Sequence, residues 1–391
     1  ADIKALSSAQ IGALSTAQLV ALNTAQIAAI DAADLKALGS AQIVALTTAQ
    51  AQALSSAQVA ALTTTQLQQL QVADFAALTS AAIRGLTAAQ IASLTTAQIV
   101  GLTTAQAAAL TNAQVAALTT AQIRALEVAD LAKLATSTIA AMSSAQIASI
   151  GTAQIDDLTT AQVRAIETTD IVALTTAQMQ ALTSSQVAAL TIPQMVALTT
   201  AQIAALNDPL SASQQIAREV GALTTAQIQA LTTAQIAAWT TAHTAALSST
   251  QIAVMSTAQV RAIETVDLPA LDTSAIRALT SAQVAALTTG QIAALTTYQI
   301  QAVEVVDLKA MGTAQVVALT TAQANALTSA QVANLTTAQL RALQTADLAA
   351  IATDSIIALT AAQIAALTSA QVDALTTAQT RALTTAQIKA L

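Results

Sequence analysis

The chain has 391 residues, of which 54% are hydrophobic, 1% are aromatic and 8% are charged, and its formal net charge at pH 7 is −7. This much apolar side chain excludes intrinsic disorder, which requires low hydrophobicity, and the scarcity of Lys and Arg excludes a nucleic-acid backbone as partner. A helix that spans a membrane needs about 20 consecutive apolar residues. Here Thr, Ser and Gln interrupt the apolar residues in nearly every group of eight, so we expect no membrane span.

Residues 1–206 consist of eight-residue repeats, or octads. An apolar residue, usually Leu, recurs at every eighth position from Leu6 to Leu206 without a slip. Strict internal periodicity is typical of repeat architectures. A single long helix is disfavoured, because at about 3.6 residues per turn the repeated Leu would rotate by roughly 80° per octad and form no stable face.

Residues 207–222 interrupt the octads with the sequence NDPLSASQQIAREVGA. Asn207-Asp208-Pro209 predicts a turn, and Ser211–Val220 predicts one longer helix that Gly221 closes at a C-cap position. We interpret the whole interval between Leu206 and Leu223 as an insertion into one continuous solenoid, because subtracting it restores the longer period described below.

Residues 223–391 return to the octad, and Leu223–Ile228 shows how each repeat restarts a helix. Thr224 and Gln227 have the spacing of a capping box, in which each side chain bonds the backbone N–H of the other residue. Leu223 and Ile228 occupy the two positions of a hydrophobic staple. A helix start in every octad predicts helices of about one and a half turns, separated by bends.

Helices this short are unstable alone, so the sequence predicts an all-α solenoid, a superhelix with one short helix per octad. Leu and Ile or Val are expected to point inward, and Ala is expected to let neighbouring coils approach closely. Thr and Gln are expected at the corners and on the outer face. The residue after the Ile or Val, such as Arg124 or Gln180, is predicted to point outward.

A longer period of five octads is superimposed on the single octad. Asp replaces Gln at Asp2, Asp34, Asp74, Asp130, Asp170, Asp267, Asp307 and Asp347, and most neighbours in this series are separated by five octads. We interpret this five-octad period as one or two turns of the superhelix.

Two interpretations of the Asp residues are open. In the first, Asp at the third helical position complements the helix dipole and pairs with the Arg six residues earlier, as Asp130 would with Arg124. In the second, the Asp residues of adjacent coils form a column that binds Ca²⁺, which prefers several oxygen ligands. The candidate ligands are Asp130, Asp170, Asp267, Asp307 and Asp347.

No residues predict an active site. His243, the single His, stands in a Gln slot without an Asp and a Ser at the spacing of a catalytic triad. Trp239 replaces a repeated Leu and is expected to fill the core. Tyr298 takes an Ala slot and Phe75 an Ile slot, and neither is expected to form an aromatic platform for bases or sugars. Because nucleotide-binding glycine motifs are absent as well, we expect neither catalysis nor a cofactor other than the Ca²⁺ considered above.

The LTTAQ octads resemble the Ala-, Thr- and Gln-rich tracts of very large secreted, adhesin-like proteins of aquatic proteobacteria. The resemblance covers nearly the whole chain and implies a fibrous role at the cell surface or outside the cell. The absence of Cys, which excludes disulfides, fits such a location. We therefore expect a structural protein that forms a rod, stalk or filament.

Neither end shows an evident polar capping repeat, which a free-standing solenoid normally needs. We therefore expect a segment of a longer array, or a unit that stacks end to end with copies of itself. The alternative is a binding module whose outer Thr/Gln face or Asp column recognises ice, glycans or Ca²⁺.

Overall fold

The computed structural model describes residues 3–206 and 220–391. All helices in these residues are three to six residues long, and no strand occurs among them. This confirms the predicted all-α solenoid of short helices. The chain divides into two compact units, Ala1–Ala197 and Leu198–Leu391. None of the helices described has the length and hydropathy that crossing a membrane requires.

The first unit contains one short helix in each octad. Its helices are η1 (Ile3–Ala5), α1 (Ser8–Gly12), α2 (Thr16–Val20), α3 (Thr24–Ala28), η2 (Asp34–Ala37), α4 (Ser40–Val44), α5 (Thr48–Gln52), α6 (Ser56–Ala61), α7 (Thr64–Gln69), α8 (Val72–Ala77), α9 (Ser80–Gly85), α10 (Ala88–Ser93), α11 (Thr96–Val100), α12 (Thr104–Ala108), α13 (Asn112–Ala117), α14 (Thr120–Ala125), α15 (Val128–Leu131), α16 (Thr136–Ala140), α17 (Ser144–Ser149), α18 (Thr152–Asp156), α19 (Thr160–Ala165), α20 (Thr168–Ile171), α21 (Thr176–Gln180), α22 (Ser184–Ala189) and α23 (Ile192–Ala197).

The second unit repeats this organisation. Its helices are α24 (Thr200–Ala204), α26 (Thr225–Ala230), α27 (Thr233–Ala237), α28 (Thr241–Ala245), α29 (Ser249–Val254), α30 (Thr257–Ala262), η3 (Leu268–Ala270), α31 (Thr273–Arg277), α32 (Ser281–Ala286), α33 (Thr289–Ala294), α34 (Thr297–Ala302), α35 (Val305–Ala310), α36 (Thr313–Val317), α37 (Thr321–Ala326), α38 (Ser329–Ala333), α39 (Thr337–Ala342), α40 (Thr345–Ala350), α41 (Thr353–Ile356), α42 (Ala361–Ile364), α43 (Ser369–Asp373), α44 (Thr377–Ala382) and α45 (Thr385–Ile388).

Most octads fold through the same series of backbone conformations, and α26 is representative. Thr224 precedes the helix with an extended backbone (φ −67°, ψ 156°), and Leu231 follows it with φ −61° and ψ 137°. None of the described residues has a positive φ, so the bends between helices do not depend on Gly. The β-branched Thr that follows most of the repeated Leu residues suits the extended backbone of the bend better than a helix interior.

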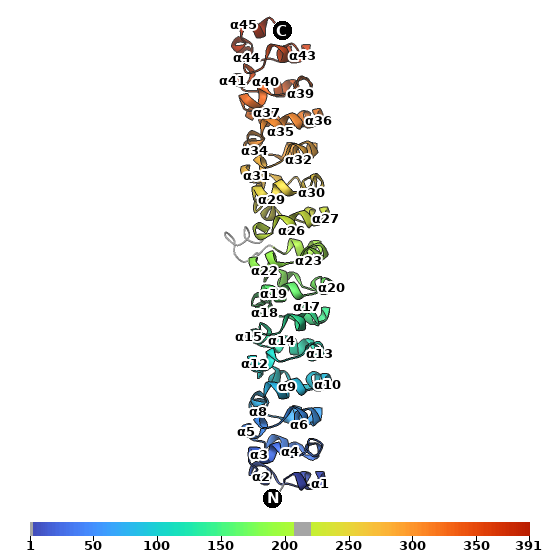
Figure 1. Cartoon of the computed structure of the whole chain (residues 1–391). Helices are drawn as coiled ribbons and strands as arrows, with labels where there is room; N and C mark the ends of the chain where they lie inside the picture. The colour runs from blue at the N-terminus through green and yellow to red at the C-terminus, as the bar shows by residue number, and fades with distance from the viewer. Residues whose placement is uncertain (1–2, 207–219) are drawn as a thin grey trace. The chain divides into compact units, whose positions relative to one another are not determined.

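Between three and four octads complete one turn of the superhelix. In the first unit, α10 packs against α7 and α13, which lie three helices before and after it. Hydrogen bonds between neighbouring coils join residues 28 and 31 positions apart, as between Gln90 and the carbonyls of Leu62 and Val59. Figure 1 shows successive coils of this unit one above the next, from α1 to α23. The five-octad period is therefore not a whole number of turns, and our interpretation of it as one or two turns is wrong.

The repeated Leu and the Ile or Val form a continuous core within each unit. Ile99 and Leu102, for example, keep only 1% and 6% of their surfaces exposed. Phe75 and Trp239 fill slots of the same two kinds and are also buried. Neighbouring coils approach closely. At Gly85, for example, an added Cβ would lie only 2.9 Å from the backbone oxygen of Ser56 in the adjacent coil.

The Gln side chains lie inside the wall, contrary to the prediction that they face outward. Gln98, Gln194 and Gln291 are each 1% exposed, whereas Thr95 and Thr96 are exposed. The outer face is therefore built mainly from Thr and Ala, and exposed Gln occurs in the slot after the Ile, as at Gln229 and Gln301. A combined Thr/Gln binding face does not form where one coil covers another.

Part of the predicted insertion lies outside the described residues. These residues are 207–219, which contain the predicted turn and most of the predicted helix Ser211–Val220, and Asp2 is outside the description as well. Val220 and Gly221 are both helical, so Gly221 is not at the predicted C-cap position.

Hydrogen bonds within the second unit show how the register changes across this segment. Gln235 donates to the carbonyl of Leu198, 37 positions earlier, whereas Gln251 donates to that of Leu223, 28 positions earlier. The offset between coils is therefore nine positions longer where it spans this segment.

Candidate functional site

One side chain in most octads joins two coils, and Gln50 shows how it does so. Its Oε1 accepts a hydrogen bond from the backbone N–H of Thr47 at 3.0 Å, and the Thr47 hydroxyl accepts from the Gln50 N–H at 3.3 Å. Its Nε2 donates to the carbonyls of Leu19 and Leu22 at 2.9 and 2.8 Å. These carbonyls lie at the end of α2, where helical partners run out. One amide therefore caps the start of its own helix and the end of a helix in the preceding coil.

The same bonds recur along both units. In the first unit, Nε2 of Gln98 donates to the carbonyls of Leu67 and Leu70 at 2.7 and 3.0 Å. In the second, Gln379 donates to those of Leu348 and Ile351 at 3.0 and 2.8 Å. A hydrogen bond of this kind contributes about 1 kcal/mol net, and a buried carbonyl left without its donor costs about 1–3 kcal/mol. We call this set of buried, coil-joining Gln residues the glutamine ladder.

A capping box alone explains only half of this arrangement. Glu closes a capping box as well as Gln does, yet in the octad register that slot never contains Glu and most often contains Gln. Only Gln combines the acceptor that caps its own helix with a donor for the neighbouring coil. This preference is the sequence signal that reasoning from capping alone missed.

The four residues that represent the octad in the sequence lie together at the start of α26. The Thr224 hydroxyl accepts from the N–H of Gln227 at 3.2 Å, and Oε1 of Gln227 accepts from the N–H of Thr224 at 2.8 Å. Leu223 and Ile228, on either side of this pair, are 4% and 0% exposed. Each octad therefore combines a polar cap with two core residues.

Most of the Asp residues that replace Gln bond to a hydroxyl group in the preceding coil. Oδ1 of Asp74 accepts from the hydroxyl of Thr48 at 2.8 Å, and Oδ1 of Asp267 accepts from that of Thr241 at 2.7 Å. The other pairs are Ser8 with Asp34, Ser144 with Asp170, Ser281 with Asp307 and Thr321 with Asp347. In each pair the partners are 26 positions apart, and the hydroxyl belongs to the second residue of a Ser or Thr pair. The first residue of the pair is the one that caps a helix.

Two of these octads keep an amide donor at a different position. Gln71 precedes the octad's helix without capping it, and its Nε2 donates to the carbonyl of Val44 at 2.9 Å. Gln344 donates to Val317 over the same distance. In the Asp74 octad, the donor to the preceding coil is thus supplied by Gln71, while Asp74 accepts from a hydroxyl group of that coil.

The predicted ion pair between Arg124 and Asp130 does not form. The Nε of Arg124 instead donates to the carbonyl of Ser149 at 3.2 Å, and Oδ2 of Asp130 is buried without a hydrogen-bond partner. Burial raises the pKa of Asp130 to about 6, and the negative charge of Glu127 adds to the rise. A substantial fraction of this carboxyl is therefore protonated at mildly acidic pH.

The structure does not gather the candidate Ca²⁺ ligands. In residues 3–206 and 220–391, no three side chains of His, Asp or Glu are arranged to hold a metal ion. Asp170, Asp267, Asp307 and Asp347 each bond to a hydroxyl instead. Calcium binding at Asp130 or at these residues stays a prediction.

His243 imitates the capping half of a Gln but not the coil-joining half. Its Nδ1 accepts from the N–H of Thr240 at 3.0 Å, while its Nε2 and the hydroxyl of Thr244 are both buried without a partner. Burial lowers the pKa of His243 to about 4, against an opposing effect of Asp267. The ring is therefore neutral at pH 7.

The carbonyl that a Gln at position 243 would reach can be found from the register. The preceding and following members of the ladder, Gln235 and Gln251, donate to Leu198 and Leu223. The intermediate position therefore lies opposite Leu206, the repeated Leu between those two. We infer that His243 marks a missing bond of the ladder next to residues 207–219.

Short helices restarted in every octad, coils stacked within each unit and a buried amide ladder define the class of protein, a structural tandem-repeat α-solenoid. Eleven segments match the model of the ALTTAQ repeat, so the chain belongs to the ALTTAQ repeat family, as the octads predicted. The matched residues are 1–30, 27–64, 67–104, 91–120, 123–160, 163–200, 218–249, 260–297, 300–337, 340–377 and 362–391. No curated protein matches the chain.

Proposed function

We propose that this chain is a non-enzymatic structural protein of the cell surface or extracellular matrix, where it serves as a stalk or filament. The glutamine ladder is the observation that carries the proposal. Gln114 donates to the carbonyls of Ile83 and Leu86 in the coil before it. The carbonyls of the next core residues after Gln114, Val115 and Leu118, accept in turn from Gln146 of the following coil. A wall in which every coil presents donors in one direction and acceptors in the other can be extended without changing its interfaces.

The surface supports self-association and a location outside the cell. Soluble designed domains carry about 25–35% charged residues on their surfaces, whereas this whole chain has 8% and exposes Thr and Ala instead. Little charge repulsion therefore opposes contact between copies. Thirteen Lys and Arg residues in 391 offer few cleavage positions to trypsin-like proteases, and the absence of Cys makes the fold insensitive to thiol oxidation.

Electron microscopy and cell labelling test the two parts of this proposal separately. Negative-stain images of the purified chain should show filaments of constant width that lengthen with protein concentration. An antibody against the chain should label intact source cells. Discrete particles at every concentration contradict filament formation, and labelling that requires permeabilised cells contradicts the surface location.

A further inference from the structure

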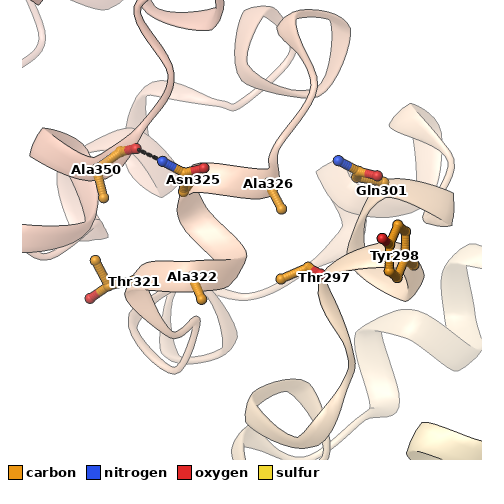
Figure 2. A pocket seen from close by; sticks show the side chains of 8 residues that line it. All are labelled: Thr297, Tyr298, Gln301, Thr321, Ala322, Asn325, Ala326 and Ala350. Atoms are coloured by element: carbon orange, nitrogen blue, oxygen red, sulfur yellow. Dashed lines mark hydrogen bonds between the residues drawn. The ribbon is translucent and has the colours of Figure 1, made fainter.

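A groove lies on the surface of the second unit, beside Tyr298. It has a volume of about 650 Å³ and is lined by residues of α34 and α37 and by Ala350 of α40. These helices belong to successive coils, since α34 packs against α37 and α37 packs against α40. Figure 2 shows Tyr298 and Gln301 on one side of the groove, with Asn325 between them and Ala350. The groove therefore runs along the stacking direction, across residues of three successive coils.

Three side chains that depart from the common octad meet in this groove. Tyr298 stands where most octads have Ala, and Gln301 and Asn325 stand in the slot after the Ile or its replacement, where Ala is common. Tyr298 is the single Tyr of the chain and is 75% exposed, whereas Phe75 and Trp239 are buried. An exposed ring adds little to the stability of the fold, so its position calls for another explanation.

The groove combines an aromatic ring with oriented, uncharged polar groups. Nδ2 of Asn325 donates to the carbonyl of Ala350 at 2.8 Å, which fixes the amide and leaves Oδ1 as an acceptor. The Thr321 hydroxyl is held by the carboxylate of Asp347 at 2.8 Å, and the second oxygen of that buried carboxylate has no donor. Gln301 is exposed beside the ring.

The lining selects among classes of ligand. None of the groove's lining residues is charged, which disfavours phosphates, nucleotides and ions. Two other grooves among the described residues contain an Arg and a Glu each, Arg124 with Glu127 and Arg277 with Glu304. The groove at Tyr298 thus differs in being aromatic and neutral. Binding sites of this kind orient a ligand through a few fixed polar groups around an apolar contact.

We propose that this groove binds a neutral oligosaccharide. A pyranose ring has one face of C–H groups, which packs against an aromatic ring, and a rim of hydroxyl groups, which suits the amides of Gln301 and Asn325. Ala322 and Ala326 also line the groove. Because the groove crosses three coils, it accommodates several linked sugars rather than one. This activity is separate from the structural role proposed above.

The single Tyr provides a direct readout. The purified chain is titrated with cellohexaose, maltohexaose, xylohexaose and chitohexaose, and binding is followed by the NMR signals of the Tyr298 ring and by calorimetry. We expect at least one hexaose to shift the ring signals, with a Kd on the order of 10⁻⁴ M. Tyr298→Ala should weaken that binding about tenfold or more, and Tyr298→Phe should retain most of it.

Two controls keep the test independent of folding. Tyr298→Ala installs the residue found in most octads, so the fold should persist, and Gln229→Ala removes an exposed Gln of the same unit outside the groove without affecting binding. Ala226→Tyr combined with Ala253→Asn should create a second groove, because these positions reproduce the separation in sequence of Tyr298 and Asn325 beside Gln229. The proposal is overturned if no hexaose shifts the ring signals up to about 10 mM, or if Tyr298→Ala leaves binding unchanged.

Discussion

The glutamine ladder predicts that Gln98→Glu, which replaces the side-chain amide with a carboxyl group, strongly destabilises the fold. The variant keeps the acceptor for the N–H of Thr95, now 3.1 Å from Oε1. It loses the donor for the carbonyls of Leu67 and Leu70, at 2.7 and 3.0 Å. The side chain is 1% exposed, so a carboxylate would face two carbonyl oxygens away from water. Loss of two bonds at about 1 kcal/mol each, together with burial of an unpaired charge, predicts a loss of about 3–5 kcal/mol at pH 7.

The pH dependence of this loss has a definite sign. Burial against carbonyl oxygens raises the pKa of the introduced carboxyl above its unfolded value of about 4.3. The folded variant therefore holds its proton more tightly than the unfolded chain, and its stability falls as the pH rises through that range. At low pH the protonated acid can donate to one carbonyl. The deficit relative to the unmodified chain should shrink by about half between pH 7 and pH 4.

Urea unfolding followed by circular dichroism at both pH values measures this deficit, and Gln18→Glu is the matched control. Gln18 has the same capping bond, at 2.9 Å, but is exposed in the first coil, so its replacement should change stability by no more than about 0.5 kcal/mol. Equal unfolding midpoints for the two variants, or a deficit at position 98 that does not depend on pH, would refute the coil-joining role of the amide.

Three further predictions concern the titratable groups. Because burial raises the pKa of Asp130 to about 6, the free energy of unfolding of the chain falls as the pH rises from about 4 to 6. Asp130→Asn should remove this pH dependence and stabilise the fold by about 2 kcal/mol at pH 7. Urea titration measures the gain, with Asp373→Asn at an exposed position as the control. Because burial lowers the pKa of His243 to about 4, the fold loses stability as the pH falls from about 6.5 to 4. In thermal melts, His243→Gln should abolish that loss and stabilise the fold by about 1 kcal/mol at pH 7. An unchanged pH profile in this variant would contradict the buried, neutral state of His243. EDTA should leave the Tm unchanged, since hydroxyl groups occupy the Asp oxygens that a Ca²⁺ column would use, and a fall of several degrees on chelation would restore the calcium interpretation.

The features predicted from the sequence are those that one octad encodes by itself. Thr224 and Gln227 specify a helix start, and Leu223 and Ile228 specify the buried face, through residues no more than five positions apart. The turn length is different, because it depends on which octads come to lie side by side. That choice is made by bonds such as Gln50 to Leu22, between residues 28 positions apart. Periodicity within a single chain contains no measure of that distance.

The partners of the polar residues were mispredicted for the same reason. Arg124 and Asp130 are neighbours along the chain, and an ion pair between them is the simplest local expectation. The packing of coils instead offers Arg124 the carbonyl of Ser149, which lies 25 positions away. Similarly, Tyr298 gave no sign of a binding surface, because its companion Asn325 comes from the next coil. Sites shared between coils become visible only once the offset of about one turn is known.

The two periods of the molecule together determine what the Asp residues can do. Outside the coils that span residues 207–219, residues hydrogen-bonded between neighbouring coils lie between 25 and 31 positions apart, as Gln68 with Ser93 and Gln90 with Val59 do. The Asp residues that replace Gln are separated by four octads or more, most often by five. In the part of the chain that the structure describes, no such Asp therefore lies directly on another, and most of them bond to a hydroxyl group instead. Since like charges in contact would weaken the stack, the longer period disperses the carboxylates, and the same dispersal keeps them from converging on one cation.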